Sequence, residues 1–290
     1  MKNIAFDKNY FLEVDTSYVI NPSNYTALHH LRIYKKFKKC TLCINEIYVG
    51  TGIIKYNIEE KNAYIIDNEI NALKRLQGEK HIAKLIKLDE ILFYKYGKYL
   101  CLEYYKGGDL QDYLSSQYFT PCNVDKVIVI MKQLIKAVKN CHKHNVVHAD
   151  IKLENIIFKK YIKSLDINEL KENIILIDFG SSVIIDRHDD NKYHITQLIK
   201  RITPYYIAPE MNDPSIFLEQ KDILYYDYWC IGIVCYLLLT GKYPFSMINV
   251  NEKRYNIVYP KNSPIPDHIK IFILNLLQYE PLKRKFISFE

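Results

Sequence analysis

The hydrophobic periodicity changes along this chain, and the change limits the folds that it can adopt. Over residues 31–56 the pattern alternates and is rich in β-branched and aromatic side chains, which predicts two or three β-strands. Residues 125–144 carry apolar side chains at i, i+3 and i+4 and predict a long amphipathic helix, and helical patterns resume from Asp227. A strand-rich first third followed by a helix-rich remainder predicts an α+β fold of two unequal lobes.

Shorter segments complete this pattern. They predict a helix over 67–77, strands over 82–88 and 91–102, a helix over 110–114, and a hairpin of 156–158 with 174–177. The hairpin encloses an insert, residues 159–173, which is a surface helix or a partner site. Residues 1–30 are mixed in pattern and predict an extension without an assigned role.

The composition is that of a soluble globular protein, with 49% apolar and 25% charged residues in a chain of 290. The net charge of +7 fits a polyanionic ligand or an acidic partner, and no arginine-rich tail or RNA-binding signature is present, so nucleic-acid binding is not expected. The longest apolar run, residues 229–239, is shorter than the roughly 20 residues that span a bilayer, so membrane insertion is not expected either.

The chain has seven cysteines, an odd number, and its first ten residues do not form a signal peptide. This predicts a reducing compartment and hence an intracellular protein of the cytoplasm or nucleus. Cys40 and Cys43 have the spacing of zinc ligands, but no second pair follows at the usual distance, so packing within a strand is the better interpretation.

Three short motifs occur in a fixed order. Residues 148–155 read His-Ala-Asp-Ile-Lys-Leu-Glu-Asn, Asp-Phe-Gly follows at 178–180, and Ala-Pro-Glu at 208–210. Together they resemble the protein kinase superfamily. The resemblance implies a single protein kinase domain over residues 1–290. Its small β-rich lobe would comprise residues 1–105 with the N-terminal extension, and its larger helical lobe residues 106–290.

The resemblance also implies a division of labour in phosphoryl transfer from ATP. Asp150 would accept or orient the proton of the substrate hydroxyl, and Lys152 would lie beside the transferred phosphate. Asn155 and Asp178 would supply oxygen ligands to Mg²⁺ or Mn²⁺. Alone, Asn155 is equally a turn residue and Asp178 equally a helix cap. Lys152 and Thr203, which would bond to Asp150 and Lys152, imply a serine/threonine kinase.

Two further contacts follow from the resemblance and concern the fold. Glu210 would form a buried ion pair with Arg284, near the C-terminus. Asp227 would anchor the backbone of residues 148–155 from a buried helix.

The ATP site is expected from residues in both lobes. Lys55 would touch the phosphates and be held by Glu69; Lys61 is a rival for this role, but it leaves little room for the turn before the helix. The adenosine contacts implied by the resemblance are Leu102 as gatekeeper, the backbone of Glu103 and Tyr105 at the purine, Asp109 at the ribose, and Ile157 beneath the adenine.

Two departures from the family pattern stand out. Aligned on Phe37, the phosphate-covering loop at residues 33–40 contains no glycine and has lysines instead. These lysines either form a solvated hairpin or neutralise phosphate directly. Ala149 stands where the family usually has an arginine that meets a phosphate on the activation segment. Its presence predicts activity without phosphorylation of residues 181–203.

The sequence therefore predicts a serine/threonine protein kinase that uses ATP and acts on protein substrates. The stretch around residues 148–155 is similar to that of baculoviral kinases, although AT-rich eukaryotic members fit nearly as well. Asp109 and Glu154 match positions that imply basic residues near the phosphosite. The alternatives are a pseudokinase scaffold, favoured by the missing glycines and Ala149, and a small-molecule kinase, disfavoured by residues 208–210.

Overall fold

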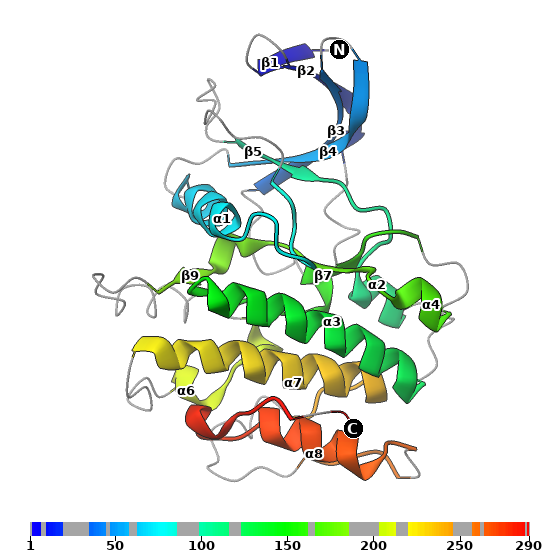
Figure 1. Cartoon of the computed structure of the whole chain (residues 1–290), viewed down its shortest axis with the longest axis vertical. Helices are drawn as coiled ribbons and strands as arrows, with labels where there is room; N and C mark the ends of the chain where they lie inside the picture. Colours follow the sequence, from blue (N-terminus) through cyan, green and yellow to red (C-terminus); the bar gives the residue numbers. More distant parts are fainter. Residues whose placement is uncertain are drawn as a thin grey trace. The chain divides into compact units, whose positions relative to one another are not determined.

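The computed structural model divides the chain into two compact units (Figure 1), which are Met1–Gly78 with Ala83–Lys106 and Glu79–Ile82 with Gly107–Glu290. The residues that the structure describes are 2–6, 10–19, 35–44, 47–57, 63–85, 99–115, 123–161, 166–185, 203–212, 220–245, 257–261, 264–287 and 289. The first unit holds a sheet and one helix, and the second is mainly helical.

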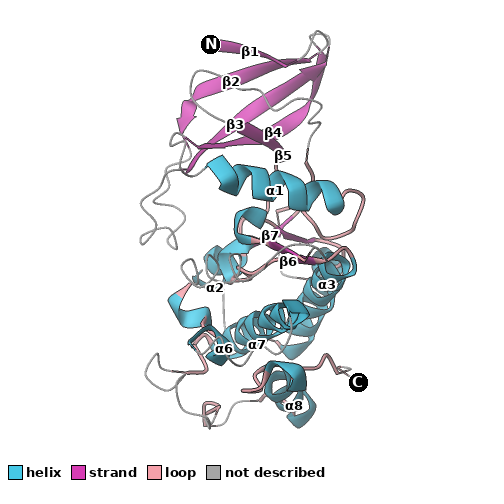
Figure 2. Cartoon of the chain, turned by 90° about the vertical axis from the view of Figure 1, so that its left-hand side faces the viewer, coloured by secondary structure: helices cyan, strands magenta, loops and turns pink. Residues whose placement is uncertain are grey.

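The first unit contains a five-stranded antiparallel sheet in the order β1-β2-β3-β4-β5, drawn in magenta in Figure 2. Its strands are β1 (Lys2–Phe6), β2 (Tyr10–Val19), β3 (Lys35–Ile44), β4 (Ile47–Asn57) and β5 (Tyr99–Glu103). Every neighbouring pair follows the chain order, so the sheet is built from antiparallel strands in sequence.

The strands predicted over residues 31–56 are confirmed as β3 and β4, and they correct the placement of the phosphate-covering loop at residues 33–40. From Lys35 onward these residues form the first half of β3, in register with β4 from Lys35 opposite Asn57 to Cys40 opposite Gly52, and they are not a loop. The connection between β2 and β3, residues 20–34, lies outside the described residues. Residues 20–34 contain no glycine either, so the strand does not by itself account for the missing glycines.

Helix α1 (Ala63–Arg75) completes the first unit. Ile66, Ile70 and Leu73 are buried on one face, and the helix begins earlier than the predicted 67 because this apolar face extends back to Ile66. Gly78 follows the helix with a φ of 85°, a conformation that side chains disfavour. Instead of the predicted strand over 82–88, the described residues contain isolated bridges, one of which joins Leu85 to Leu102.

The second unit is built around three long helices that lie side by side in Figures 1 and 2: α3 (Val124–Lys143), α7 (Leu224–Thr240) and α8 (Asp267–Leu276). Helix α3 starts at Asn123, whose side chain accepts a hydrogen bond from the Asp125 backbone, and the predicted helix over 125–144 is confirmed. Helix α7 is buried on all sides, as expected for a helix that is apolar around its circumference.

Shorter elements connect these helices. They are α2 (Leu110–Ser115), α4 (Ile167–Leu170), α6 (Pro209–Asn212), the strands β6 (Val146–Val147), β7 (Ile156–Phe158), β8 (Ile174–Leu176) and β9 (Val183–Ile184), and the 3₁₀ helices Leu153–Asn155, Phe179–Ser181, Pro204–Tyr206, Gln220–Ile223 and Pro281–Lys283. The antiparallel pair of β7 and β8 confirms the predicted hairpin. Gln133 of α3 closes the base of the insert, since its amide accepts from the backbone of Asn173 and Ile174 and donates to Leu170.

Four residues between α1 and the following chain belong to the second unit. Ile82 forms a parallel bridge with Leu176, whose N–H donates to the His81 carbonyl at 2.9 Å. Glu79 lies 2.8 Å from the Nε2 atom of His144, at the end of α3. Among the described residues, no helix combines the length and apolar character that crossing a bilayer requires.

Candidate active site

The loop of residues 148–155 is anchored through its backbone. The N–H groups of His148 and Ala149 donate to the two carboxylate oxygens of Asp227, each at 2.9 Å, and Asp227 is fully buried in α7. Ala149 has a φ of 64°, a left-handed conformation that is costly for alanine, and charge-assisted bonds of this kind hold it there. The predicted anchoring role of Asp227 is confirmed.

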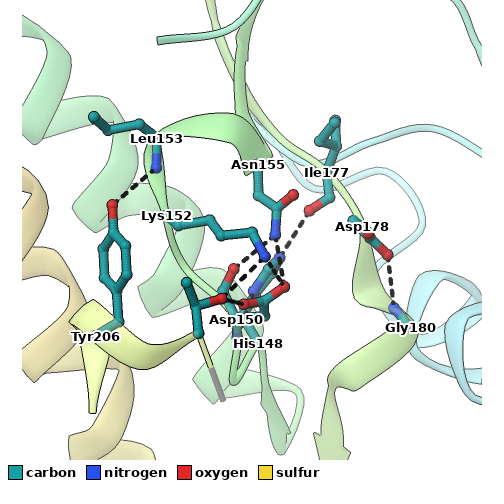
Figure 3. A network of polar contacts seen from close by, with 10 residues as sticks. His148, Asp150, Lys152, Leu153, Asn155, Ile177, Asp178, Gly180 and Tyr206 are labelled. Carbon is teal, nitrogen blue, oxygen red and sulfur yellow. Dashed lines mark hydrogen bonds and ion pairs between the residues drawn. The ribbon is translucent and has the colours of Figure 1, made fainter. Parts of the chain in front are cut away.

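His148 connects this loop to the segment before Asp178 (Figure 3). The N–H of Asp150 donates to Nδ1 of His148 at 3.2 Å, so the imidazole proton resides on Nε2 and is donated to the Ile177 carbonyl at 2.9 Å. The ring also meets Phe179 edge to face, with centroids 4.7 Å apart. The histidine of the motif is therefore a buried connector between two loops that carry acidic side chains.

The polar side chains of the loop converge on Asp150 (Figure 3). Lys152 Nζ lies 2.8 Å from Asp150 Oδ2, and Asn155 Nδ2 donates to the backbone carbonyl and the carboxylate of Asp150 at 2.7 and 3.1 Å. Thr203 donates to Asp150 Oδ1 at 3.1 Å and accepts from Lys152 at 3.2 Å. The contacts predicted for Thr203 are thus present, and they fix the carboxylate in one orientation.

Lys152 remains cationic in this setting. Burial alone would lower the pKa of its ammonium group, but the charge of Asp150 and its hydrogen bond, with smaller contributions from Asp178 and Glu154, raise that pKa above its ordinary value. A permanent positive charge beside the Asp150 carboxylate suits the neutralisation of an anionic group arriving at the loop.

Asp178 and Asn155 fit the role of cation ligands. Asp178 has a φ of 62° and a ψ of 72°, a left-handed conformation in which its carboxylate accepts from the Gly180 N–H at 3.4 Å. The Asn155 amide nitrogen is engaged by Asp150, so its carbonyl oxygen is the atom suited to ligate a metal. No group of three or more His, Cys, Asp or Glu side chains that could by themselves hold a metal ion occurs in the described part of the chain. Two protein oxygens suit Mg²⁺, which retains waters and binds phosphate oxygens as well.

The residues of the first unit that were predicted to form the ATP site lie in β4, in α1, and at or just after the end of β5. Lys55 lies in β4, opposite Phe37 on one side and Leu100 on the other. Glu69 is fully buried in α1. At the end of β5, Leu102 is buried, and the Tyr105 hydroxyl donates to the Glu103 carboxylate at 3.2 Å while accepting from the Lys84 N–H.

Asp109 and Ile157 lie together in the second unit, where they form an isolated antiparallel bridge. Asp109 caps α2, since its Oδ1 accepts from the Asp112 N–H at 2.7 Å. Burial raises the pKa of its carboxyl to about 7, and the nearby charges of Asp112 and Glu154 act in the same direction. The sequence prediction placed Asp109 at a ribose. The structure adds a helix-capping role, and the raised pKa means that its carboxyl is partly protonated near neutral pH.

Three supporting contacts complete the site, and one of them was predicted. Arg284 pairs with Glu210 through two hydrogen bonds of 2.5 and 2.6 Å, with both side chains buried, as expected from the sequence. His142, 2.8 Å from Asp227, was missed because a histidine within a helix gives no local signal of its partner. Tyr206, whose hydroxyl accepts from the Leu153 N–H, was also missed, although it lies between the predicted residue Thr203 and the motif at 208–210.

Comparison with known proteins agrees with this fold. Residues 36–288 match the family model described as the protein kinase domain. The chain belongs to the protein kinase family.

Its relatives include several serine/threonine kinases. The chain is 30% identical to serine/threonine-protein kinase 33 of Bos taurus over 83% of its own length and 46% of that protein. It is 30% identical to the cell cycle serine/threonine-protein kinase CDC5/MSD2 of Saccharomyces cerevisiae over 66% of its length and 25% of that protein. The chain therefore spans about half the length, or less, of these curated relatives.

Proposed function

We propose that this protein is an ATP-dependent serine/threonine protein kinase that transfers the γ-phosphate of ATP to Ser and Thr hydroxyls of protein substrates. The observation that carries the proposal is the network in which Lys152, Asn155 and Thr203 hold the Asp150 carboxylate. An oriented carboxylate next to a fixed cation matches what phosphoryl transfer requires, namely positioning and charge neutralisation.

The residues have distinct tasks in this mechanism. Asp150 orients the attacking hydroxyl and accepts its proton, and protonated Lys152 stabilises negative charge on the transferred group. Asn155 and Asp178 would hold the divalent cation, Mg²⁺ or Mn²⁺, which would neutralise charge on the phosphates. Lys55 and Glu69 position the phosphates from the first unit. The resemblance to the family assigns nucleoside binding to Leu102, the backbone of Glu103 and Tyr105, Asp109 and Ile157.

The test is transfer of labelled phosphate from γ-labelled ATP to a generic protein substrate, with an Asp150→Asn variant as the control. Asparagine keeps the shape of the side chain but cannot accept the proton, so the rate is expected to fall by about 10²- to 10⁴-fold while the protein stays folded. Equal, low transfer by both proteins would refute the catalytic proposal. EDTA should abolish transfer, and either Mg²⁺ or Mn²⁺ should restore it.

The proposal includes activity that does not depend on phosphorylation of residues 181–203. Ala149 is 1% exposed and offers no cation to a phosphate, so a phosphorylated segment gains no charge-assisted contact at this position. Phosphatase treatment, or a Ser181→Ala/Thr196→Val variant, should leave most of the activity. Ser182 is excluded from this variant because its hydroxyl donates to the Phe179 carbonyl and is buried.

The proposed substrates carry a basic residue near the phosphorylated hydroxyl. Glu154 follows Asp150 closely in the loop, and its Oε2 atom is buried without a hydrogen-bond partner among the described residues. Burial raises the pKa of this carboxyl, and a cationic side chain would relieve the unpaired oxygen. A peptide library should show selection for Arg or Lys, and Glu154→Gln should remove it. Selection for acidic residues would contradict this proposal.

A pseudokinase scaffold is the second candidate, and Ala149 is the observation that favours it. The absence of glycine also favours it, because residues 20–34 between β2 and β3 contain none either and the first glycine of the chain is Gly50. The transfer assay separates the two candidates. A kinase transfers labelled phosphate and loses that activity in the Asp150→Asn variant, whereas a scaffold transfers little with either residue.

A further inference from the structure

Helix α3 carries a row of lysines on its outward face. Lys132, Lys136, Lys139 and Lys143 are all exposed, and their spacing of i, i+4, i+7 and i+11 places them along one line of the helix. At 1.5 Å per residue the row is about 16 Å long. The opposite face, with Met131, Leu134 and Val138, is buried in the second unit. Figure 1 shows this helix, in green, between β7 and α7.

The fold does not explain this row of like charges. No Asp or Glu occurs between Lys126 and Lys143, whereas exposed helix faces usually alternate the two signs. Lysines at i+3 and i+4 repel one another and weaken the helix that carries them. Within the described residues, one carboxylate is paired with the row, since Glu79 lies 3.6 Å from Lys143. Repulsion between these lysines lowers the stability of the helix, and no other carboxylate within the described residues offsets it. Such a loss of stability is expected where a surface has a function.

Neighbouring groups reinforce the positive charge. Lys285 is exposed and precedes Phe286, whose ring lies 5.5 Å from the Lys139 ammonium group. Lys80, with its side chain 65% exposed, follows the Glu79 that meets the end of α3, and its backbone carbonyl accepts from Asn140. The acidic groups that border this surface are Glu79, Glu172, which lies 3.6 Å from the Lys80 ammonium group, and Asp125, at the first turn of α3; the lysines outnumber them, so the surface remains net positive.

We propose that this lysine row is a docking surface for an acidic helical segment of a partner protein, with carboxylates at the same i, i+4, i+7 and i+11 spacing. The row is one residue wide, which matches a single line of charges. Helix α3 has no arginine and no exposed aromatic side chain that would stack on bases, as nucleic-acid binding sites commonly do. None of the exposed large apolar side chains of the described residues lies on α3, so no residue there would insert into a membrane.

The test is direct binding, without ATP, to a fluorescein-labelled alanine-based helical peptide that carries glutamates at this spacing. A peptide of equal composition with its glutamates spread around the helix is the control ligand. The Lys132→Gln/Lys136→Gln/Lys139→Gln/Lys143→Gln variant should weaken binding of the aligned peptide at least about tenfold. The matched variant Lys74→Gln/Lys159→Gln/Lys160→Gln/Lys261→Gln, which removes the same charge elsewhere, should stay within about twofold of the wild-type affinity.

Two additional variants test whether a loss of binding arises from the missing charges or from disturbed folding. The corresponding four-fold Lys→Arg variant retains the charge and should retain binding. A Lys132→Gln/Lys136→Gln variant leaves the contacts of Lys139 and Lys143 intact and should still lose several-fold in affinity. The proposal is overturned if both peptides bind equally or if both four-fold glutamine variants lose affinity equally. It is also overturned if duplex DNA or phosphatidylserine vesicles bind this row more tightly than the aligned peptide does.

Discussion

The two sides of the loop at residues 148–155 use similar contacts for different purposes. On one side Asp227 and the Glu210–Arg284 pair are buried, with each side chain at most 1% exposed. On the other side the side chains of Asp150 and Lys152 are 14% and 12% exposed and pair at 2.8 Å. Both sets are charge-assisted hydrogen bonds. The difference in solvent access indicates that the first set holds the fold together, whereas the second set is accessible, as the proposed catalysis requires.

The largest expected effect concerns the buried side. Replacing Arg284 with Met leaves the Glu210 carboxylate charged, buried and unpaired, and it also removes hydrogen bonds to the Tyr225 and Gln278 carbonyls. Breaking such a pair from one side costs about 3–5 kcal/mol, so chemical denaturation should show a loss of that size. The control is Lys283→Met, which removes an exposed pair with Glu280 and should change stability by no more than about 1 kcal/mol. Similar losses of unfolding free energy in the two variants would show that the buried pair contributes no more to stability than the exposed one.

The Asp227→Asn variant tests whether the buried carboxylate that anchors residues 148–155 also affects the rate of phosphate transfer. An amide accepts through one oxygen only, and its NH₂ group faces a backbone N–H, so one of the two bonds to His148 and Ala149 is lost. We expect a loss of about 2–3 kcal/mol in unfolding free energy. The transfer rate should fall as well, because Ala149 is no longer held at positive φ. Unchanged activity in a destabilised protein would show that this anchor serves the fold alone.

Asp109 provides a test by pH. Its pKa is raised to about 7 in the folded protein, against an unfolded value near 3.9, so the folded state retains a proton that the unfolded state has lost. Stability from this group is complete below the unfolded pKa and is lost as pH rises through the folded one. Relative to Asp109→Asn, the unfolding free energy of the wild-type protein should therefore fall by roughly 1 kcal/mol per pH unit between about pH 5 and pH 7. Parallel pH profiles would show that Asp109 titrates normally.

The smallest effect is expected at Thr203, on the half-exposed side. Thr203→Val removes the hydroxyl between Asp150 and Lys152 and should reduce the transfer rate by about tenfold, with a change in stability of less than about 1 kcal/mol. Thr203→Ser restores the hydroxyl and should restore the rate. A large loss of stability in the valine variant would place Thr203 with the buried supports instead.

Local patterns predicted the helices and the catalytic loop well. The apolar spacing over residues 125–144 gave α3, and the order of motifs gave Asp150, Lys152 and Thr203 as neighbours before any distance was known. Asp227 and Arg284 were also predicted, although they lie 79 and 74 residues from their respective partners His148 and Glu210. These contacts were found through the family pattern, because periodicity carries no information about such distant pairs.

The sheet was predicted less well, for a physical reason. Strands β1 and β2 fall in residues 1–30, which have no clear alternation, and their formation depends on pairing with β3 further along the chain. Residues 35–40 were predicted both as part of a strand region and as the phosphate-covering loop, and the structure shows the strand. His142 and Tyr206 were missed because their roles depend on Asp227 and Leu153, and sequence spacing does not show which partner a side chain faces.

The assignment of residues 79–82 to the second unit affects how this protein can be divided. The chain passes between the units after Gly78, after Ile82 and after Lys106, so a fragment that starts at Gly107 omits part of the second unit. In such a fragment the Leu176 N–H would lose the His81 carbonyl, and the Ile174 carbonyl would lose its contact with the His81 ring. Separate expression of the helical part should therefore give a poorly folded product, and adding residues 79–82 as a peptide should improve its folding.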